Sequence, residues 1–83
     1  MTDLSRLDTD KIDEVALALL AFTMHRDGFV TRAWKGLDWD ILGRLHEKGW
    51  IGNPKGKAKS VVLTEEGKRL AEEYVQKHFG LGD

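Results

Sequence analysis

The sequence predicts a small α+β domain with three helices and one β-hairpin, and three observations carry this prediction. Apolar residues recur with helical spacing near residues 9–25 and again in 64–79. A shorter helical segment, 38–48, begins at a capping aspartate and ends at a glycine. Between the last two helices, a turn rich in glycine, asparagine and proline separates two short β-prone stretches.

Length and composition bound the kind of protein. The 83 residues have room for one domain, 1–83, with a thin core, and residues 1–7 and 80–83 are expected to be flexible. Cysteine is absent, which excludes disulfides, thiol catalysis and thiolate zinc sites. No signal peptide is recognised, and the longest apolar run, 15–22, is too short to span a bilayer. We therefore expect a cytoplasmic protein with no membrane partner.

Local signals define the first helix and the segment after it. Asp8 is placed to cap the helix, and Leu7 and Ile12 occupy the positions of a hydrophobic staple. The expected buried stripe is Ile12, Val15, Ala16, Leu19 and Leu20. Gly28 is expected to end the helical region. The stretch from Gly28 to Leu37 has no helical stripe, and a short strand and a single turn are both open for it.

The second helix and the hairpin follow. Asp38 is the expected cap, with Leu37 and Leu42 as staple, and Trp50 after Gly49 is placed to fold back on Leu45. A two-stranded wing is expected between the second and third helices, built from residues 50–51 and 61–63 around the turn at 52–56.

The last helix begins at Thr64, whose hydroxyl is the expected cap. Glu65 and Glu66 favour the positive end of this helix, and Gly80 ends it. Its expected apolar stripe is Leu70, Ala71, Tyr74, Val75 and Phe79.

Two resemblances follow from these residues. From Trp39 to Val75, the order of helix, Glu-Lys-Gly-Trp-Ile, basic loop, Val-Val-Leu-Thr-Glu-Glu-Gly and helix resembles the recognition helix, wing and closing helix of MarR- and PadR-like winged-helix regulators. The whole chain is also similar to short uncharacterised bacterial proteins with Arg-Ala-Trp-Lys-Gly-x-Asp-Trp-Asp and His-Glu-Lys-Gly-x-Ile, here 32–40 and 46–51. The first resemblance implies a reduced winged helix, since 28–37 is too short for both a strand and a scaffold helix. The second implies no activity.

One function hypothesis is nucleic-acid binding through the basic centre of the chain. The net charge is −1, but residues 42–60 carry five basic residues against one acidic residue. The expected phosphate contacts to double-stranded DNA are Arg44, Lys48, Lys55, Lys57 and Lys59. The alternative is that the loop lysines keep an exposed strand and loop soluble.

The other hypothesis is a protein-interaction or homodimerisation module without DNA binding. The last helix is one expected surface, and a patch of aromatic and basic residues, Arg32, Trp34, Lys35 and Trp39, is the other. Packing in the core is the competing interpretation of Trp34 and Trp39, and it is the expected role of Trp50.

Catalysis is not predicted. His25, His46 and His78 match no metal spacing, and the acidic pairs lack a partner base, a nucleophile or a glycine-rich phosphate cradle. We expect no enzyme activity, no metal, no cofactor and no small-molecule substrate.

Overall fold

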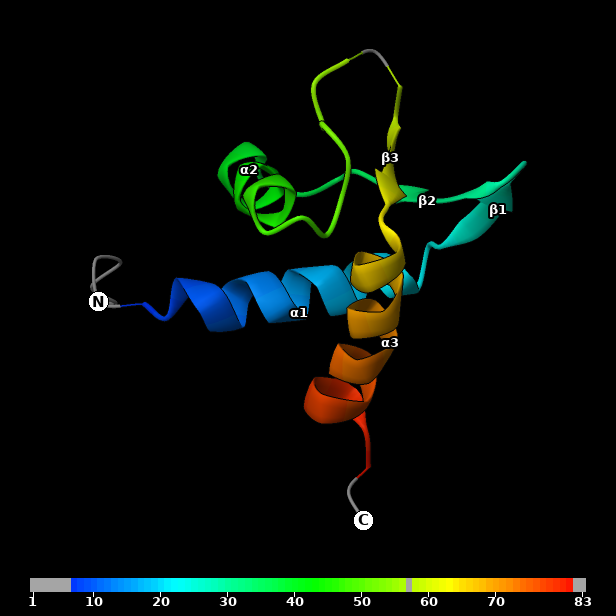
Figure 1. The fold of residues 1–83 in the computed structure, drawn as a ribbon. Coiled ribbons are helices and arrows are strands. Elements are labelled where there is room, and N and C mark those ends of the chain that lie inside the picture. Colours follow the sequence, from blue (N-terminus) through cyan, green and yellow to red (C-terminus); the bar gives the residue numbers. More distant parts are fainter. Residues whose placement is uncertain (1–6, 57, 82–83) are drawn as a thin grey trace.

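The computed structural model describes residues 7–56 and 58–81. Along the chain come helix α1 (Thr9–Ala21), strands β1 (His25–Asp27) and β2 (Val30–Trp34), helix α2 (Trp39–Glu47), strand β3 (Ser60–Leu63) and helix α3 (Glu65–Phe79). In Figure 1, α1 and α3 cross in the lower part of the molecule, with α2 and the sheet above them. The predicted class is confirmed as a small α+β domain with three helices. The expected flexibility of the chain ends falls mostly on residues 1–6 and 82–83, outside the described residues.

Helix α1 begins where its capping pattern predicts but ends earlier. The Asp8 carboxylate accepts a hydrogen bond from the Lys11 amide, 3.0 Å away. The predicted continuation to residue 25 is wrong, because the helix ends at Ala21 and His25 already belongs to β1. The Thr23 hydroxyl is held in the bend, donating to the Leu20 carbonyl and accepting from the Trp34 amide at 2.9 Å. Pairing with β2, rather than the local pattern, therefore sets the end of this helix.

Strands β1 and β2 form the hairpin that the sequence did not predict. Asp27 pairs with Val30, and Gly28 turns the chain between them at a φ of 65°, a conformation that glycine adopts without strain. Gly28 is thus a turn residue in a hairpin and not the end of a helix, which corrects the expectation. Of the two alternatives for residues 28–37, the strand is confirmed.

The sheet has three antiparallel strands in the order β1-β2-β3, and this corrects the predicted two-stranded wing. β3 takes β2 as its partner, with Thr31 opposite Leu63 and Trp34 opposite Ser60. The expected pairing of 50–51 with 61–63 survives as a single bridge between Ile51 and Leu63, continued by one hydrogen bond from the Gly52 amide to the Val62 carbonyl.

The loop after Ile51 cannot extend this pairing. Pro54 has no amide hydrogen to donate to a ladder, and the Asn53 side chain accepts from the Lys55 amide at 2.9 Å, which turns the chain. The Lys35 ammonium then donates to the carbonyls of Pro54, at 2.7 Å, and Gly56, at 3.1 Å. Backbone acceptors of the loop are therefore bonded to a side chain instead of to a strand.

Helix α2 has both ends that the sequence predicts. The Asp38 side chain caps it by accepting from the Asp40 amide at 3.0 Å. At the other end, Gly49 has a φ of 77°, and the Trp50 amide donates to the Leu45 carbonyl at 3.0 Å. These features form a Schellman motif. Trp50 is 9% exposed and belongs to the core, as expected.

Helix α3 begins at Thr64, and this residue also joins α3 to the end of α2. The Thr64 hydroxyl accepts from the Gly67 amide at 2.9 Å and donates to the Gly49 carbonyl. The Thr64 amide donates to the Trp50 carbonyl at 3.0 Å. Backbone bonds therefore fix the first turn of α3 against the chain leaving α2.

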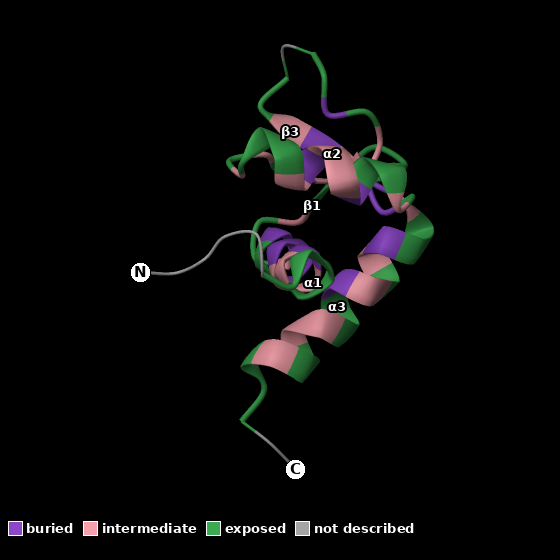
Figure 2. Ribbon diagram, turned by 90° about the vertical axis from the view of Figure 1, so that its left-hand side faces the viewer, coloured by how far each residue is buried: buried purple, intermediate pink, exposed green. Residues whose placement is uncertain are grey.

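The core lies where α1, α2, β3 and the start of α3 meet. Its fully buried apolar side chains include Leu17, Leu42, Leu45, Ile51 and Val61. Figure 2 shows α1 end-on, with α2 and β3 above it and α3 beside it. Among the elements described, α1 makes its most extensive contacts with α3. Two sides of α1 are thereby covered, one by α3 and one by the core.

A substitution at Gly67 tests the close approach of α3 to Trp50. A Cβ atom at Gly67 would collide with the Trp50 carbonyl oxygen and lie 2.7 Å from its carbonyl carbon. We expect Gly67→Ala to lower the free energy of unfolding by about 2–3 kcal/mol, because backbone must move, although alanine favours a helix. Gly43→Ala in α2 is the matched control, since its Cβ would meet nothing within 4 Å, and should gain about 0.5–1 kcal/mol. Urea unfolding followed by circular dichroism measures both; equal losses in the two variants would contradict the prediction.

Candidate functional site

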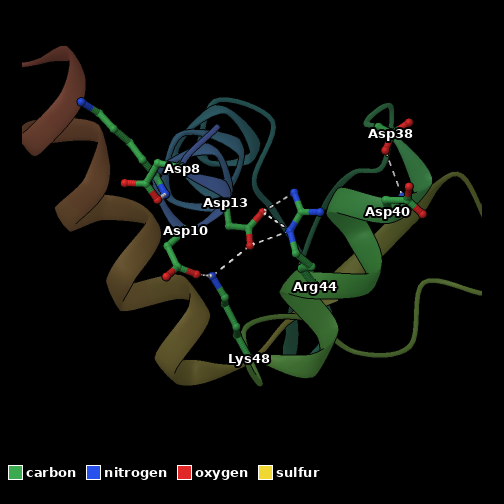
Figure 3. Close-up of polar contacts among 8 residues, drawn as sticks. Asp8, Asp10, Asp13, Asp38, Asp40, Arg44 and Lys48 are labelled. Atoms are coloured by element: carbon green, nitrogen blue, oxygen red, sulfur yellow. Dashed lines mark hydrogen bonds and ion pairs between the residues drawn. The ribbon is translucent and has the colours of Figure 1, made fainter. Parts of the chain in front are cut away.

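Two of the predicted DNA-contacting residues, Arg44 and Lys48, lie against α1 in ion pairs. The Arg44 guanidinium holds both carboxylate oxygens of Asp13 through its Nε, each at 2.9 Å, and its Nη2 lies 2.9 Å from Oδ1. The Lys48 ammonium lies 2.9 Å from Asp13 and 3.0 Å from Asp10. Figure 3 shows both cations reaching from α2 towards the acidic side of α1. Both cations are therefore already paired within the domain, and their contact with DNA stays a prediction.

The reason is the burial of Asp13. Its side chain has no exposed surface, and a carboxylate removed from water needs paired charge and hydrogen bonds. Arg44 and Lys48 are four residues apart and so share one face of α2. A signal for this cluster was present in the sequence, since Asp13 falls between the apolar positions of α1, where a charge needs a partner from another element.

The charge cluster also sets the protonation of Lys48. Burial by itself would lower the pKa of Lys48, but hydrogen bonds to Asp13 and Asp10 outweigh it, and the pKa is raised. The ammonium also lies 5.1 Å from the centre of the Trp50 ring. Lys48 is therefore a cation whose charge is already engaged within the domain.

The remaining predicted phosphate contacts lie in the loop after Ile51 and at its return into β3. Lys55 and Lys59 are exposed, and Lys57 lies outside the described residues. Exposed lysines are compatible with phosphate contacts and with a solvated loop alike. This loop surface is separate from the ion pairs of Arg44 and Lys48.

In the predicted partner patch, the two basic residues form hydrogen bonds within the domain, whereas the two tryptophans are exposed. Arg32 donates from Nε to the Ser60 hydroxyl at 2.7 Å and so joins β2 to β3. Lys35 holds the loop carbonyls and lies 6.0 Å from the Trp39 ring centre. Trp34 is 58% exposed and Trp39 is 54% exposed, so neither is a core residue, and core packing does not explain them.

An apolar groove between α1 and α2 is a surface feature that sequence reasoning missed. It has a volume of about 440 Å³, and Asp8 and Lys11 are its charged lining residues. Its apolar lining comes from α1 and from the start of α2: Leu7, Ile12, Val15, Ala16, Leu19, Leu37 and Ile41. We call this surface the α1–α2 groove.

The expected buried stripe of α1 is split between the core and this groove. Leu20 and Ala16 are buried, whereas Leu19 is 46% exposed and Ile12 and Val15 are intermediate. The signal was in the sequence: from residue 15 to residue 22 there is no polar position, so the second half of the helix is apolar all round. Such a helix is normally covered on all sides.

A second polar cluster joins α1 to the end of α3. The Glu14 carboxylate accepts from the Lys77 ammonium at 2.8 Å and lies 2.9 Å from Nε2 of His78. The hydrogen bond from Lys77, followed by that from His78, lowers the pKa of Glu14. Among the described residues no group of three or more histidine or acidic side chains is placed to hold a metal ion.

Together these features define a small α+β domain that presents an apolar groove and a basic loop on separate surfaces. The chain belongs to a family described as a domain of unknown function, DUF6429, whose model matches residues 8–81. It is similar to "Uncharacterized protein y4hR" of Sinorhizobium fredii (strain NBRC 101917 / NGR234), with 49% identity over 73 residues that cover 88% of this chain and 95% of that protein. No solved structure matches the chain.

The expected membership in a group of short uncharacterised bacterial proteins is confirmed, and the likeness to MarR- and PadR-like regulators stays a prediction. No helix in the described ranges is long and apolar enough to cross a membrane.

Removal of the buried charge should destabilise the domain. Asp13→Asn removes the carboxylate partner of Arg44 and leaves Lys48 with Asp10 alone, and we expect a loss of about 2–4 kcal/mol, below the cost for a fully buried pair because both cations are partly exposed. Asp10→Asn is the control, because the Asp10 side chain is 84% exposed, and should cost less than about 1 kcal/mol. Chemical denaturation measures both. Similar small losses would show that the cluster contributes little.

The lowered pKa of Glu14 predicts a window of acid sensitivity. A carboxyl group whose pKa is lower in the folded state stabilises the fold above its unfolded value, here 4.5, and this contribution is lost as the pH falls through the folded value. Wild-type protein should therefore exceed Glu14→Gln in stability at pH 6 by about 1 kcal/mol or less. The difference should shrink as the pH is lowered below about 4.5. Unfolding curves of both proteins between pH 6 and pH 3 measure it, and a difference independent of pH would contradict the prediction.

Proposed function

We propose that the protein is an interaction module that binds an amphipathic helix of another polypeptide chain in the α1–α2 groove. One observation carries the proposal: the stripe of α1 formed by Ile12, Val15 and Leu19 is apolar and lines the groove, yet Leu19 is 46% exposed and Ile12 and Val15 are only half-buried. In a surface helix these positions are ordinarily polar. The proposed role is binding, with no enzyme activity, in the cytoplasm.

The shape of the groove supports a helix as occupant. Its lining residues along α1 extend from Leu7, just before the helix, to Leu19, and these twelve residue steps correspond to about 18 Å along a helix axis. A partner helix of three to four turns fits that length and would place apolar residues at every third or fourth position. The lining charges, one acidic and one basic, favour a partner with little net charge.

An exposed aromatic side chain extends the same surface. Trp34 lines a smaller hollow that shares Leu19 and Leu37 with the α1–α2 groove. Tryptophan at the edge of an apolar surface is typical of anchors in protein interfaces. The partner patch predicted from the sequence is thus supported at Trp34, through its continuity with the groove.

The last helix, by contrast, exposes mostly charged residues, and its exposed aromatic residue, Phe79, lies at its end against Phe22. Its exposed positions include Arg69, Glu72 and Glu73, and Arg69 lies 2.8 Å from Glu73 in an ion pair. A charged, solvated helix face of this kind favours exposure to water. The proposal therefore transfers the expected docking surface from α3 to α1.

Nucleic-acid binding is the second candidate, and the exposed Lys55 and Lys59 favour it. The order of α1, β2, α2, the bridge at Ile51, the loop, β3 and α3 is compatible with a reduced winged helix whose wing is this loop. Against it, Arg44 and Lys48 are engaged with Asp13, and the exposed residues of α2 include Asp40 and Glu47. Acidic residues oppose approach to phosphates, so the loop alone would carry the affinity.

The test uses a fluorescent 18-residue helical peptide with a leucine stripe on an alanine, lysine and glutamate background. We expect binding to the wild-type domain by fluorescence anisotropy, weakened about 10-fold or more by Leu19→Lys, since burying a leucine contributes about 1.5–3 kcal/mol. Phe29→Lys is the matched control, because Phe29 is 98% exposed in the turn after β1, and should bind as the wild type does.

Three results would decide against the proposal. Absence of peptide binding by the wild-type domain would reject the groove as a helix site. Equal weakening by Leu19→Lys and Phe29→Lys would show that the peptide binds elsewhere. Salt-sensitive binding of duplex DNA, with no binding of the peptide, would favour the second candidate.

A further inference from the structure

The helix that best fits the α1–α2 groove belongs to a second copy of this chain. We propose that two copies pair α1 against α1, antiparallel and about a two-fold axis, so that each copy covers the apolar stripe of the other. This inference rests on the proposed function and names its partner. It assigns to the groove a role in self-association that the family description leaves open.

Charge on the other helices points to α1 as the matching surface. The exposed face of α2 includes Asp40 and Glu47, and that of α3 includes Glu72 and Glu73. Burying those faces would remove charges from water, which is costly unless each is paired. Among the described helices, α1 is the one that presents an apolar stripe several turns long to solvent.

The stripe is complementary to itself in the antiparallel orientation. When the axis passes between Val15 and Ala16, Ile12 of one copy lies opposite Leu19 of the other, and Val15 lies opposite Ala16. The apolar positions at the centre of the groove then meet one another, as an interface around a two-fold axis requires. Ala16 lines the groove but is only 4% exposed, so Val15 of each copy supplies most of the contact at the centre.

The lining charges are compatible with this arrangement. The two Asp8 side chains would be separated by about 22 Å along the helix axis, farther than the screening length of about 8 Å in physiological salt. Lys11 would lie near the last turn of the partner helix, where the helix dipole favours a cation. A parallel pairing would instead place Asp8 beside Asp8 and Lys11 beside Lys11. Charge therefore favours the antiparallel orientation.

The size of the interface indicates a weak dimer. Contact between two helices of three to four turns, flanked by Leu37 and Ile41, covers less area than a standard interface of about 800 Å² per partner. We expect a dissociation constant of about 10–500 µM, in the range of transient associations. The pairing would then depend on protein concentration.

Sedimentation equilibrium of the full chain from 2 to 500 µM in 150 mM NaCl tests the proposal. The apparent mass should rise from 9.4 kDa towards twice that value. Leu19→Lys should remain monomeric throughout, while Phe29→Lys should associate as the wild type does. Circular dichroism of each variant checks that the fold is retained, and the wild-type measurement alone decides whether the chain associates.

Cysteine cross-linking tests the orientation, because the natural chain has no cysteine. Single variants Ile12→Cys and Leu19→Cys are mixed in equal amounts at 200 µM and oxidised gently. Antiparallel pairing predicts a mixed disulfide between the two variants in at least about fivefold excess over either self-disulfide, because only unlike positions then meet. A predominance of self-disulfides would overturn the antiparallel pairing.

The outcomes separate this inference from the function on which it rests. A wild-type chain that is monomeric at every concentration, yet binds the leucine-stripe peptide, rejects the second copy and keeps the helix site. A monomer that binds no peptide rejects both. A dimer that persists in Leu19→Lys uses another surface and overturns the inference.

Discussion

A carboxylate that is excluded from water has to be paired, and in this domain that requirement fixes how α2 sits on α1. Asp13 is fully buried and holds Arg44 and Lys48 at distances of 2.9 Å. A removed partner would leave a charge with no water to solvate it, so the pairing defines one relative position of the two helices. The same position brings Leu37 and Ile41 alongside α1 and forms the second wall of the groove. One buried charge thus places the apolar surface and engages the bases of α2.

The junction between α2 and α3 is a second constraint, made of backbone rather than charge. Thr64 bonds to Trp50 and Gly49, and the chain at Gly67 passes so close to Trp50 that a side chain has no space. Glycine inside a helix costs about 1 kcal/mol in conformational entropy relative to alanine. Its presence here is explained by the closer packing that it permits, which a thin core needs.

The sequence predicts the elements that depend on interactions between residues close together in the chain, and not those that depend on distant residues. The starts of all three helices were predicted, because Asp8, Asp38 and Thr64 act within one turn of their own positions. The sheet was not, because β2 and β3 are 26 residues apart at the Trp34–Ser60 pair, and no local pattern encodes that pairing. The end of α1 failed for the same reason, since pairing of β1 with β2 decides where the helix ends.

For the candidate site, the sequence identified basic and aromatic residues correctly, but it did not show which residues they contact or how exposed they are. Arg44 and Lys48 were recognised as bases on one helix face, and the partner that holds them, Asp13, lies 31 residues from Arg44 in the chain. Trp34 and Trp39 were weighed chiefly as core residues, although hydrophobicity alone does not decide which large side chain a small domain has space to bury. The exposure of a large side chain depends on how the helices and strands pack together, so it can be determined only from the three-dimensional structure.

Charge and apolar surface together separate the two functions. A nucleic-acid-binding domain needs cations that are free to replace counterions at phosphates, whereas Arg44 and Lys48 are paired with Asp13 and only partly exposed. An interaction module needs accessible apolar surface, and within the described residues the stripe of α1 from Ile12 to Leu19 provides it over about two turns. Both conditions involve α2, because Arg44 and Lys48 pair with the buried Asp13 while Leu37 and Ile41 line the groove beside α1. The loop lysines are independent of this constraint, so a contribution from them to binding would add to the groove rather than compete with it.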